Sequence, residues 1–279
     1  MKRRFILYLM AIMLLDTVLA GDQKEVASTW RSAEFKIDGA DSEWAGALTY
    51  FEKTKLAYAF CNDSSNLYLC FVFEPEIRQQ VVMFGFTVWL DATGHEKKTF
   101  GVRFPMGLFN FDDTAMPDPM AMRENPERFQ SQLALMLREV EVFGPEKDDR
   151  NRFNHSGIFG LQAAGVESFG TLFCELKIPL AVATGRPYAI GTEAGKTMSL
   201  GFEMGTMNRE KMRQRMGERS GPMGGGRPPG GMPPGGGVPG GGGRPGGMEG
   251  GFPGGRRPDQ DEMFKAFKTW MRVTLAATK

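Results

Sequence analysis

The chain has 279 residues, of which 41% are hydrophobic and 24% are charged, and its formal net charge is +1. This near-neutral balance gives no support to nucleic-acid binding, which usually requires a strongly basic surface. The 37 glycines and 17 prolines are more than a globular domain of this length needs, and they are concentrated late in the chain. The folded part is therefore shorter than the chain.

The first twenty residues are typical of a signal peptide. Basic residues at positions 2–4 precede an apolar run at 5–15, and small residues at 18 and 20 stand where a signal peptidase cleaves. A membrane anchor is the alternative, but the apolar run is about half of the roughly 20 residues that a spanning helix needs. We therefore expect cleavage after Ala20, export to the periplasm or beyond, and no transmembrane segment in the mature chain.

Residues 56–73 contain the strongest local pattern, two alternating apolar runs joined by the turn-forming segment 62–66. This pattern predicts a β-hairpin. If residues 63–66 form a four-residue loop, Phe60 lies opposite Leu69 and the large apolar side chains of both strands share one face, which can only be a core. This core face consists of Leu56, Tyr58, Phe60, Leu69, Phe71 and Phe73.

The opposite face of this hairpin carries smaller side chains, among them Cys61 and Cys70, and is expected to be partly exposed. A register shifted by two residues, with 64–67 in the loop, sets the two cysteines directly opposite each other and leaves both faces unchanged. An oxidising compartment permits a disulfide there. Both registers stay open, and free thiols would favour the first.

Short strands are expected on either side of the hairpin. One at 35–39 begins the mature domain. After the hairpin, a long strand is expected at 81–91, with large apolar side chains at every even position from 82 to 90. The segment 92–95 is expected to be a turn that leads into a returning strand at 98–104.

Apolar residues at helical spacing follow Asn125 and Pro126, which suit an N-cap and a first helical position. The helix is expected to end near Leu137 and to pass into a strand at 138–143. The charged run 146–152 is expected to be a solvated loop. Further strands are expected at 158–163, 171–179, 188–190 and 199–205.

Residues 220–258 consist mostly of Gly, Pro, Met and Arg and are expected to form a disordered insertion. Such a segment cannot bury enough apolar surface to offset about 1–2 kcal/mol per residue of backbone entropy. A flexible loop is the simpler interpretation, and a docking arm for an anionic polymer or partner is the alternative. Residues 259–279 end in a run in which outward and apolar positions alternate, and this run is expected to return to the sheet as a strand beside 199–205.

These elements predict an all-β fold, an antiparallel β-sandwich with one short helix and a long disordered Gly/Pro-rich insertion. Residues 21–219 form the main part of this sandwich, and residues 259–279 supply its last strand. Many short strands separated by turn signals are typical of this architecture.

Four motifs, in this order, resemble the carbohydrate-binding modules of family nine and their DOMON-type relatives. They are Phe35–Gly39 with Glu43-Trp44, the hairpin turn 62–69, Val88–Asp91, and Glu175–Leu180, which is similar to the "E-x-x-I-P" strand of that group. The resemblance implies an antiparallel β-sandwich and a non-catalytic binding module with carbohydrate as the ligand. The chain departs from the sugar-binding members in the helix 125–137, the loop 146–152 and the insertion, and the paired sugar-stacking tryptophans have no identified counterpart.

Trp89 is the candidate ligand-binding residue. It lies at an odd position of the expected strand 81–91, away from the large apolar side chains, where its ring could serve as a platform for a sugar. The alternative is a structural residue covered by the following loop. Trp44 is expected to be structural.

Four carboxylates near turns could hold a structural calcium ion, since calcium takes six to eight oxygen ligands from loops. No fixed-spacing calcium loop is present, so capping of turns is the alternative role. The four are Asp38, Asp41, Glu43 and Asp91.

Other chemistry has less support. His95 and His155 are the only histidines, which disfavours a catalytic triad or a histidine-rich zinc site. Nothing fixes two carboxylates across a cleft, so no enzyme is predicted. The alternatives to a carbohydrate-binding module are an envelope scaffold that kept the sandwich without a sugar site and, third, a haem-binding electron-transfer subunit.

Overall fold

The computed structural model describes residues 25–32, 35–40, 42–51, 55–108, 126–144, 146, 149–154, 158–205 and 267–278. The expected signal peptide (1–20), the Gly/Pro-rich insertion (220–258), Asp41 and His155 lie outside these residues. None of the helices in the described part of the chain is long and apolar enough to span a membrane.

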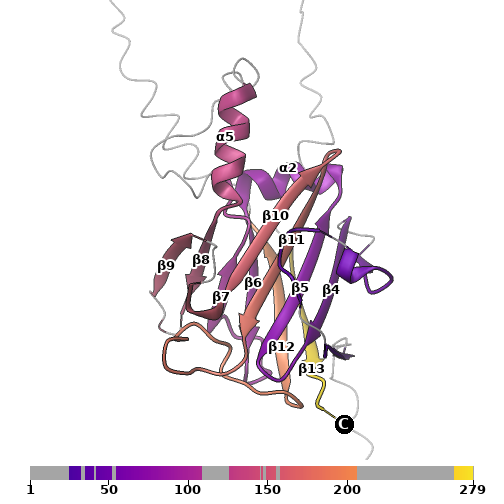
Figure 1. Ribbon diagram of the computed structural model, residues 1–279, viewed down its shortest axis with the longest axis vertical. Helices are drawn as coiled ribbons and strands as arrows, with labels where there is room; N and C mark the ends of the chain where they lie inside the picture. Colours follow the sequence, from indigo (N-terminus) through magenta and orange to yellow (C-terminus); the bar gives the residue numbers. More distant parts are fainter. Residues whose placement is uncertain are drawn as a thin grey trace, which may run out of the picture. The chain divides into compact units, whose positions relative to one another are not determined.

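Two β-sheets enclose the main core (Figure 1), which confirms the predicted all-β sandwich. All strand pairs are antiparallel except β1 with β13 and β2 with β4. The seven-stranded sheet contains, in spatial order, β1 (Glu25–Ala27), β13 (Phe267–Thr274), β12 (Thr197–Met204), β6 (Phe86–Asp91), β7 (Phe100–Arg103), β8 (Glu139–Phe143) and β9 (Arg150–Asn154). The six-stranded sheet contains β10 (Gln162–Ser168), β11 (Thr171–Pro179), β5 (Asn66–Phe73), β4 (Leu56–Asn62) and β2 (Thr29–Trp30), with β3 (Thr49–Phe51) paired to β4.

The β4–β5 hairpin has the first of the two predicted registers, with Phe60 opposite Leu69 and Asn62 opposite Leu67. Asp63 fixes its loop, because its Oδ1 accepts the backbone N–H groups of Ser65 (2.7 Å) and Asn66 (2.6 Å). In this register Cys61 lies opposite Tyr68 and Cys70 opposite Ala59. Both cysteines are buried free thiols, so the disulfide that the shifted register would allow is not formed.

The second face of this hairpin is buried, and the expectation that it is partly exposed was wrong. The N-terminal segment crosses it, and Phe35 stacks on Tyr68 with 5.0 Å between ring centroids. Trp44, in the short 3-10 helix η1 (Ser42–Trp44), contacts Phe35 at 4.6 Å. A second apolar cluster therefore covers the outside of the six-stranded sheet. Residues 35–39 are part of this cover, and the strand predicted for them is not formed.

The predicted long strand 81–91 is two elements, α2 (Pro75–Phe84) and β6. Pro75 begins the helix at a position that needs no N–H donor, and Gly85, with φ 79°, ends it. Val81, Val82 and Phe84 are all buried, with the three-residue spacing of a helix face between Val81 and Phe84, while Val82 and Phe84 alone have the two-residue spacing of a strand. The sequence pattern was compatible with both structures, and Pro75 and Gly85 decide between them.

The later elements follow the predictions in part. The helix α5 (Pro126–Met136), the strands β7, β8 and β11, and the turn after Asp91 are confirmed. The charged run 146–152 is not wholly a loop, because Arg150 begins strand β9, whose arginines face glutamates of β8. The strand predicted at 158–163 begins later than expected, because residues 158–160 form the 3-10 helix η2 (Ile158–Gly160) and β10 starts at Gln162. The strand predicted at 188–190 is not formed.

Strand β13 returns to the sheet beside β12 as predicted, and it also pairs with β1 (Figure 1, yellow). The fully buried amide of Asn62 joins the two ends of the described chain. Its Oδ1 accepts hydrogen bonds from Ser28 Oγ (2.7 Å) and the Ala276 N–H (2.9 Å), and its Nδ2 donates to the Ala276 carbonyl (2.9 Å). The last strand is thereby fastened to the central hairpin.

Candidate functional site: an aromatic row on the seven-stranded sheet

A single line of residues crosses the outer side of the seven-stranded sheet. Strand register places Trp270 beside Gly201, Gly201 beside Trp89, Trp89 beside Gly101, and Gly101 beside Phe143. Directly paired residues share a face, and the neighbours of this line along each strand belong to the core. We call Trp270, Trp89 and Phe143 the aromatic row. All three side chains are partly exposed.

Two glycines let the indole rings lie across the neighbouring strands. A Cβ atom at Gly101 would come within 2.6 Å of the Cε3 and Cζ3 atoms of Trp89. A Cβ at Gly201 would come within 2.7 Å of Cε3 of Trp270. Neither glycine has a positive φ, so what each position requires is space for the ring. Each indole therefore rests with its inner side on a glycine.

The indole of Trp89 is also held from its edges. Its Nε1 donates to Glu203 Oε2 at 2.8 Å, and the Phe143 ring lies 5.4 Å away between centroids. Lys98 forms an ion pair with the same Glu203 carboxylate and places its Nζ 5.0 Å from the Trp89 ring centroid. The ring orientation is thus fixed by one hydrogen bond, one aromatic contact and one glycine.

Cations lie over each ring of the row. Lys268 Nζ is 5.8 Å from the Trp270 centroid, and the guanidinium of Arg103 is 4.8 Å from that of Phe143. Arg103 and Arg150 both bind the buried carboxylate of Glu141, at 2.7 and 2.5 Å. Burial lowers the pKa of Arg103, and Glu141 opposes that shift. Glu141 belongs to β8 and is buried under these two arginines.

Trp89 was predicted as a ligand-binding residue, and the structure places it on the outer face. Trp270, Gly101 and Gly201 were missed. The signal for Trp270 was its alternation with the apolar Met271 and Val273, which are buried. The position of Trp270 beside Trp89 depends on β12 lying between β13 and β6, which no local pattern reveals.

Two of the four motifs that carry the family resemblance meet at one buried carboxylate, that of Glu175. Glu175 accepts hydrogen bonds from Trp44 Nε1 (2.7 Å) and from the backbone N–H groups of Asp38 (2.9 Å) and Gly39 (2.6 Å). Burial raises the pKa of Glu175, and these hydrogen bonds oppose the shift. Trp44 and Glu175 thus fasten the N-terminal segment to β11, which is a structural role.

The structure places Asp91, one of the predicted calcium ligands, in the other sheet from Asp38 and Glu43, and Asp41 lies outside the described residues. Asp91 ends β6 in the seven-stranded sheet, where it accepts the backbone N–H groups of Thr93, His95 and Lys97, each at 2.9 Å. Asp38 lies against the six-stranded sheet and pairs with Lys36. Glu43 accepts the Ser42 hydroxyl at 2.7 Å. Among the described residues no group of three or more His, Cys, Asp or Glu side chains could hold a metal ion.

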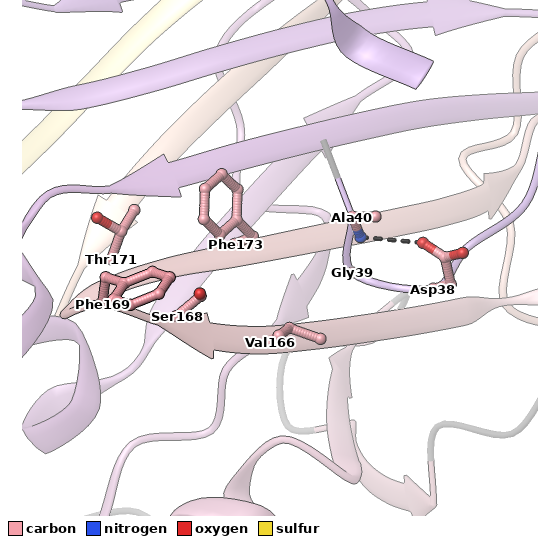
Figure 2. A pocket seen from close by; sticks show the side chains of 8 residues that line it. All are labelled: Asp38, Gly39, Ala40, Val166, Ser168, Phe169, Thr171 and Phe173. Atoms are coloured by element: carbon pink, nitrogen blue, oxygen red, sulfur yellow. Dashed lines mark hydrogen bonds between the residues drawn. The ribbon is translucent and has the colours of Figure 1, made fainter. Parts of the chain in front are cut away.

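Figure 2 shows an open hollow over the six-stranded sheet, between the β10–β11 turn and residues 38–40. Phe169 stands at the turn with its side chain fully exposed, and Val166 is 44% exposed. Ser168 and Thr171 add hydroxyl groups to the lining. The hollow offers an exposed aromatic ring, that of Phe169. Trp89, in contrast, is held in place by its contacts with Glu203, Phe143 and Gly101.

No protein-family model and no curated protein matches the sequence. Among solved structures, a carbohydrate-binding module of family 9 from Caldicellulosiruptor kristjanssonii in complex with glucose is similar at 12% identity and a TM-score of 0.34, covering 65% of this chain and 78% of that chain. A structure of a family 9 module from the same organism in complex with cellotriose is similar at 11% identity and a TM-score of 0.34, covering 65% and 76%. At these values the likeness carries no conclusion about function.

Proposed function

We propose that this protein is a non-catalytic carbohydrate-binding module and that the aromatic row is its binding face. The observation that carries the proposal is the pair of tryptophans, Trp89 and Trp270, each resting across a glycine of β7 or β12. The apolar side of a pyranose ring stacks on an aromatic face, and indole offers the largest such face among side chains. Ring faces held in place before binding lose little entropy when a ligand arrives.

The spacing of the row favours an oligosaccharide over a single sugar. Trp270 and Trp89 lie two strands apart, which is about 10 Å in a sheet whose strands are about 4.8 Å apart. Two rings at this separation on one face of the sheet suit two units of the same glycan chain. The carboxylate of Glu203 beside them, whose side chain is 32% exposed, offers a hydrogen-bond acceptor for hydroxyl groups.

The carboxylates near the row support binding rather than hydrolysis. Glu203 is engaged by Trp89 and Lys98, and Glu141 by Arg103 and Arg150. Glycoside hydrolysis needs two carboxyl groups placed on either side of the scissile bond. The proposed module acts outside the cytoplasm, in keeping with the export that residues 1–20 predict, and calcium and haem form no part of the proposal.

The experiment is a pull-down of the protein, expressed without residues 1–20, on a panel of insoluble and immobilised polysaccharides. We expect retention on at least one polysaccharide and loss of retention in Trp89→Ala and Trp270→Ala. The matched control is Phe169→Ala, which removes an exposed aromatic ring from the other sheet and should leave retention unchanged. Retention of both tryptophan variants together with loss in Phe169→Ala would place the glycan in the hollow of Figure 2 instead.

A second candidate function is that of an interaction protein of the cell envelope. The exposed apolar side chains of Phe169 and Val166 beside the hollow favour it, because such side chains are more common at protein contacts than on free surfaces. Absence of retention on every polysaccharide would favour this candidate over the first.

A further inference from the structure

We infer that the ligand of the aromatic row is an acidic polysaccharide, one that carries carboxylate groups on its sugar rings. The inference rests on the proposed function and narrows its ligand class. It is carried by the placement of cations at the rings of the row and by the unequal exposure of acidic and basic side chains on this face.

The first observation is that Lys98 and Lys268 each hold an ammonium group over an indole ring. A neutral sugar that stacks on either ring must displace this ammonium and offers nothing in exchange. A uronate sugar exchanges one contact for another, because the displaced lysine can bind the carboxylate beside the ring. The apolar side of the sugar then takes the place of the ammonium over the indole.

The second observation is that each basic side chain in the ion pairs of this face is more exposed than the glutamate with which it pairs. The side chains of Lys98, Arg150 and Arg152 are 39%, 52% and 37% exposed. The glutamates between them are less exposed, at 32% for Glu203 and 3% for Glu141. Glu141 binds both Arg103 and Arg150, while Glu203 binds Lys98 and has Lys268 as its register partner on β13.

The third observation concerns strand β13. Lys268, Trp270 and Arg272 alternate outward on it, so the outermost tryptophan has a cation on either side. Arg272 has the acidic Glu25 of β1 as its register partner, and no ion pair joins the two in the described residues. Lys268 and Arg272 are both exposed. An anionic chain that crosses the strands along the aromatic row meets these cations at each tryptophan.

The test compares three immobilised polymers, namely polygalacturonate, a neutral glucan of similar length, and polyglutamate. We expect the wild-type protein to bind polygalacturonate best and to lose at least about tenfold in affinity when the salt concentration rises from about 0.05 M to about 0.5 M, since salt screens exposed charges. The double variant Lys268→Gln/Arg272→Gln should bind polygalacturonate about tenfold more weakly and should bind the glucan no more weakly than the wild type does, since a neutral sugar loses no partner when these cations are removed. Its matched control, Lys36→Gln/Lys196→Gln, removes two exposed lysines away from the row and should behave as the wild type.

The other possible results of this test separate the acidic-ligand inference from the proposed function. Tight binding to the glucan through Trp89 and Trp270, without preference for polygalacturonate, would overturn the acidic ligand and leave the carbohydrate-binding proposal in place. Equal binding to polyglutamate and polygalacturonate would also overturn it, because charge alone would then suffice. Absence of binding to both polysaccharides would contradict the proposed function itself.

Discussion

The indole of Trp89 lies across Gly101 of the neighbouring strand, so closely that a methyl group at position 101 would meet the ring carbons Cε3 and Cζ3 at 2.6 Å. The same relationship joins Trp270 to Gly201 on the other side of β6. Two tryptophans resting on two glycines give this sheet a flat apolar surface that its core does not require. That surface is what distinguishes the sheet from an ordinary sandwich layer.

Gly101→Ala tests whether the glycine positions the ring. The new methyl group should push the Trp89 indole off the sheet and weaken glycan binding about as much as Trp89→Ala does. The free energy of unfolding should fall by only about 1 kcal/mol, since the displaced indole loses its hydrogen bond to Glu203 while the backbone at position 101 suits any residue. Binding is measured by calorimetry and stability by urea denaturation.

The control for this variant is the same change made in the Trp89→Ala background. With the indole gone, the methyl group has nothing to displace, and the second substitution should cost no further affinity. An equal loss in both backgrounds would show that Gly101 acts on the glycan by some route other than Trp89.

Asn62→Ala tests the junction between the central hairpin and the last strand. The substitution leaves the buried hydroxyl of Ser28 and both backbone groups of Ala276 without their partners. Each such loss costs about 1–3 kcal/mol, so the free energy of unfolding should fall by about 2 kcal/mol or more. Asn154→Ala, at an exposed position of β9, is the control and should change stability by less than about 0.5 kcal/mol. Equal stability of the two variants would contradict the described junction.

Asp91→Asn tests the turn that leads into β7. Burial acts to raise the pKa of Asp91, but hydrogen bonds from Thr93, Lys97 and His95 outweigh it, and the pKa lies below its ordinary value of 3.8. The stability that this carboxylate contributes is therefore fully present above pH 3.8 and is lost as the pH falls through the lower folded pKa. The variant should be about 1–3 kcal/mol less stable than the wild type near neutrality.

The difference between wild type and Asp91→Asn should shrink as the solution is acidified below pH 3.8. Urea denaturation at a series of pH values measures it, with Glu193→Gln, an exposed change, as the control. A difference that stays constant with pH would show that the turn does not depend on the charge of Asp91.

The cysteines give a prediction about reactivity. Burial raises the pKa of the Cys61 thiol to about 11 and that of Cys174 well above its ordinary value. Since thiolates are the reactive form, the native protein should react slowly with a thiol reagent at pH 8, and the unfolded protein should show three free thiols. A mass corresponding to a bond between Cys61 and Cys70 after non-reducing digestion would contradict the described register.

The hairpin could be predicted from the sequence because all of its determinants are local. Residues 62–66 specify the turn and the apolar alternation specifies the faces, while Asp63 chooses between the registers through hydrogen bonds that no pattern displays. The prediction of a strand at 81–91 was wrong over its first half, because Val82 and Phe84 fit the alternation of a strand while Val81 and Phe84 have the three-residue spacing of a helix face. Pro75, six residues before the expected strand, carried the deciding signal.

The site was predictable only through Trp89. Trp270, Gly101 and Gly201 belong to strands that come together through the order of the whole sheet, with β13 reaching β12 from the far side of the Gly/Pro-rich insertion in sequence. The exposed basic side chains of the row likewise come from separated segments of the chain. A sequence near neutral overall gives no sign that Lys98, Lys268 and Arg272 lie on the same face of one sheet.

The most direct test of the central claim is an NMR titration in which an oligosaccharide is added to the protein and the indole N–H signals of the four tryptophans are followed. The account predicts that the signals of Trp89 and Trp270, assigned by substitution, shift together with a common affinity. The signal of Trp44, whose N–H is buried against Glu175, should stay in place. Saturable binding that leaves the Trp89 and Trp270 signals unmoved would contradict the claim that the aromatic row is the binding face.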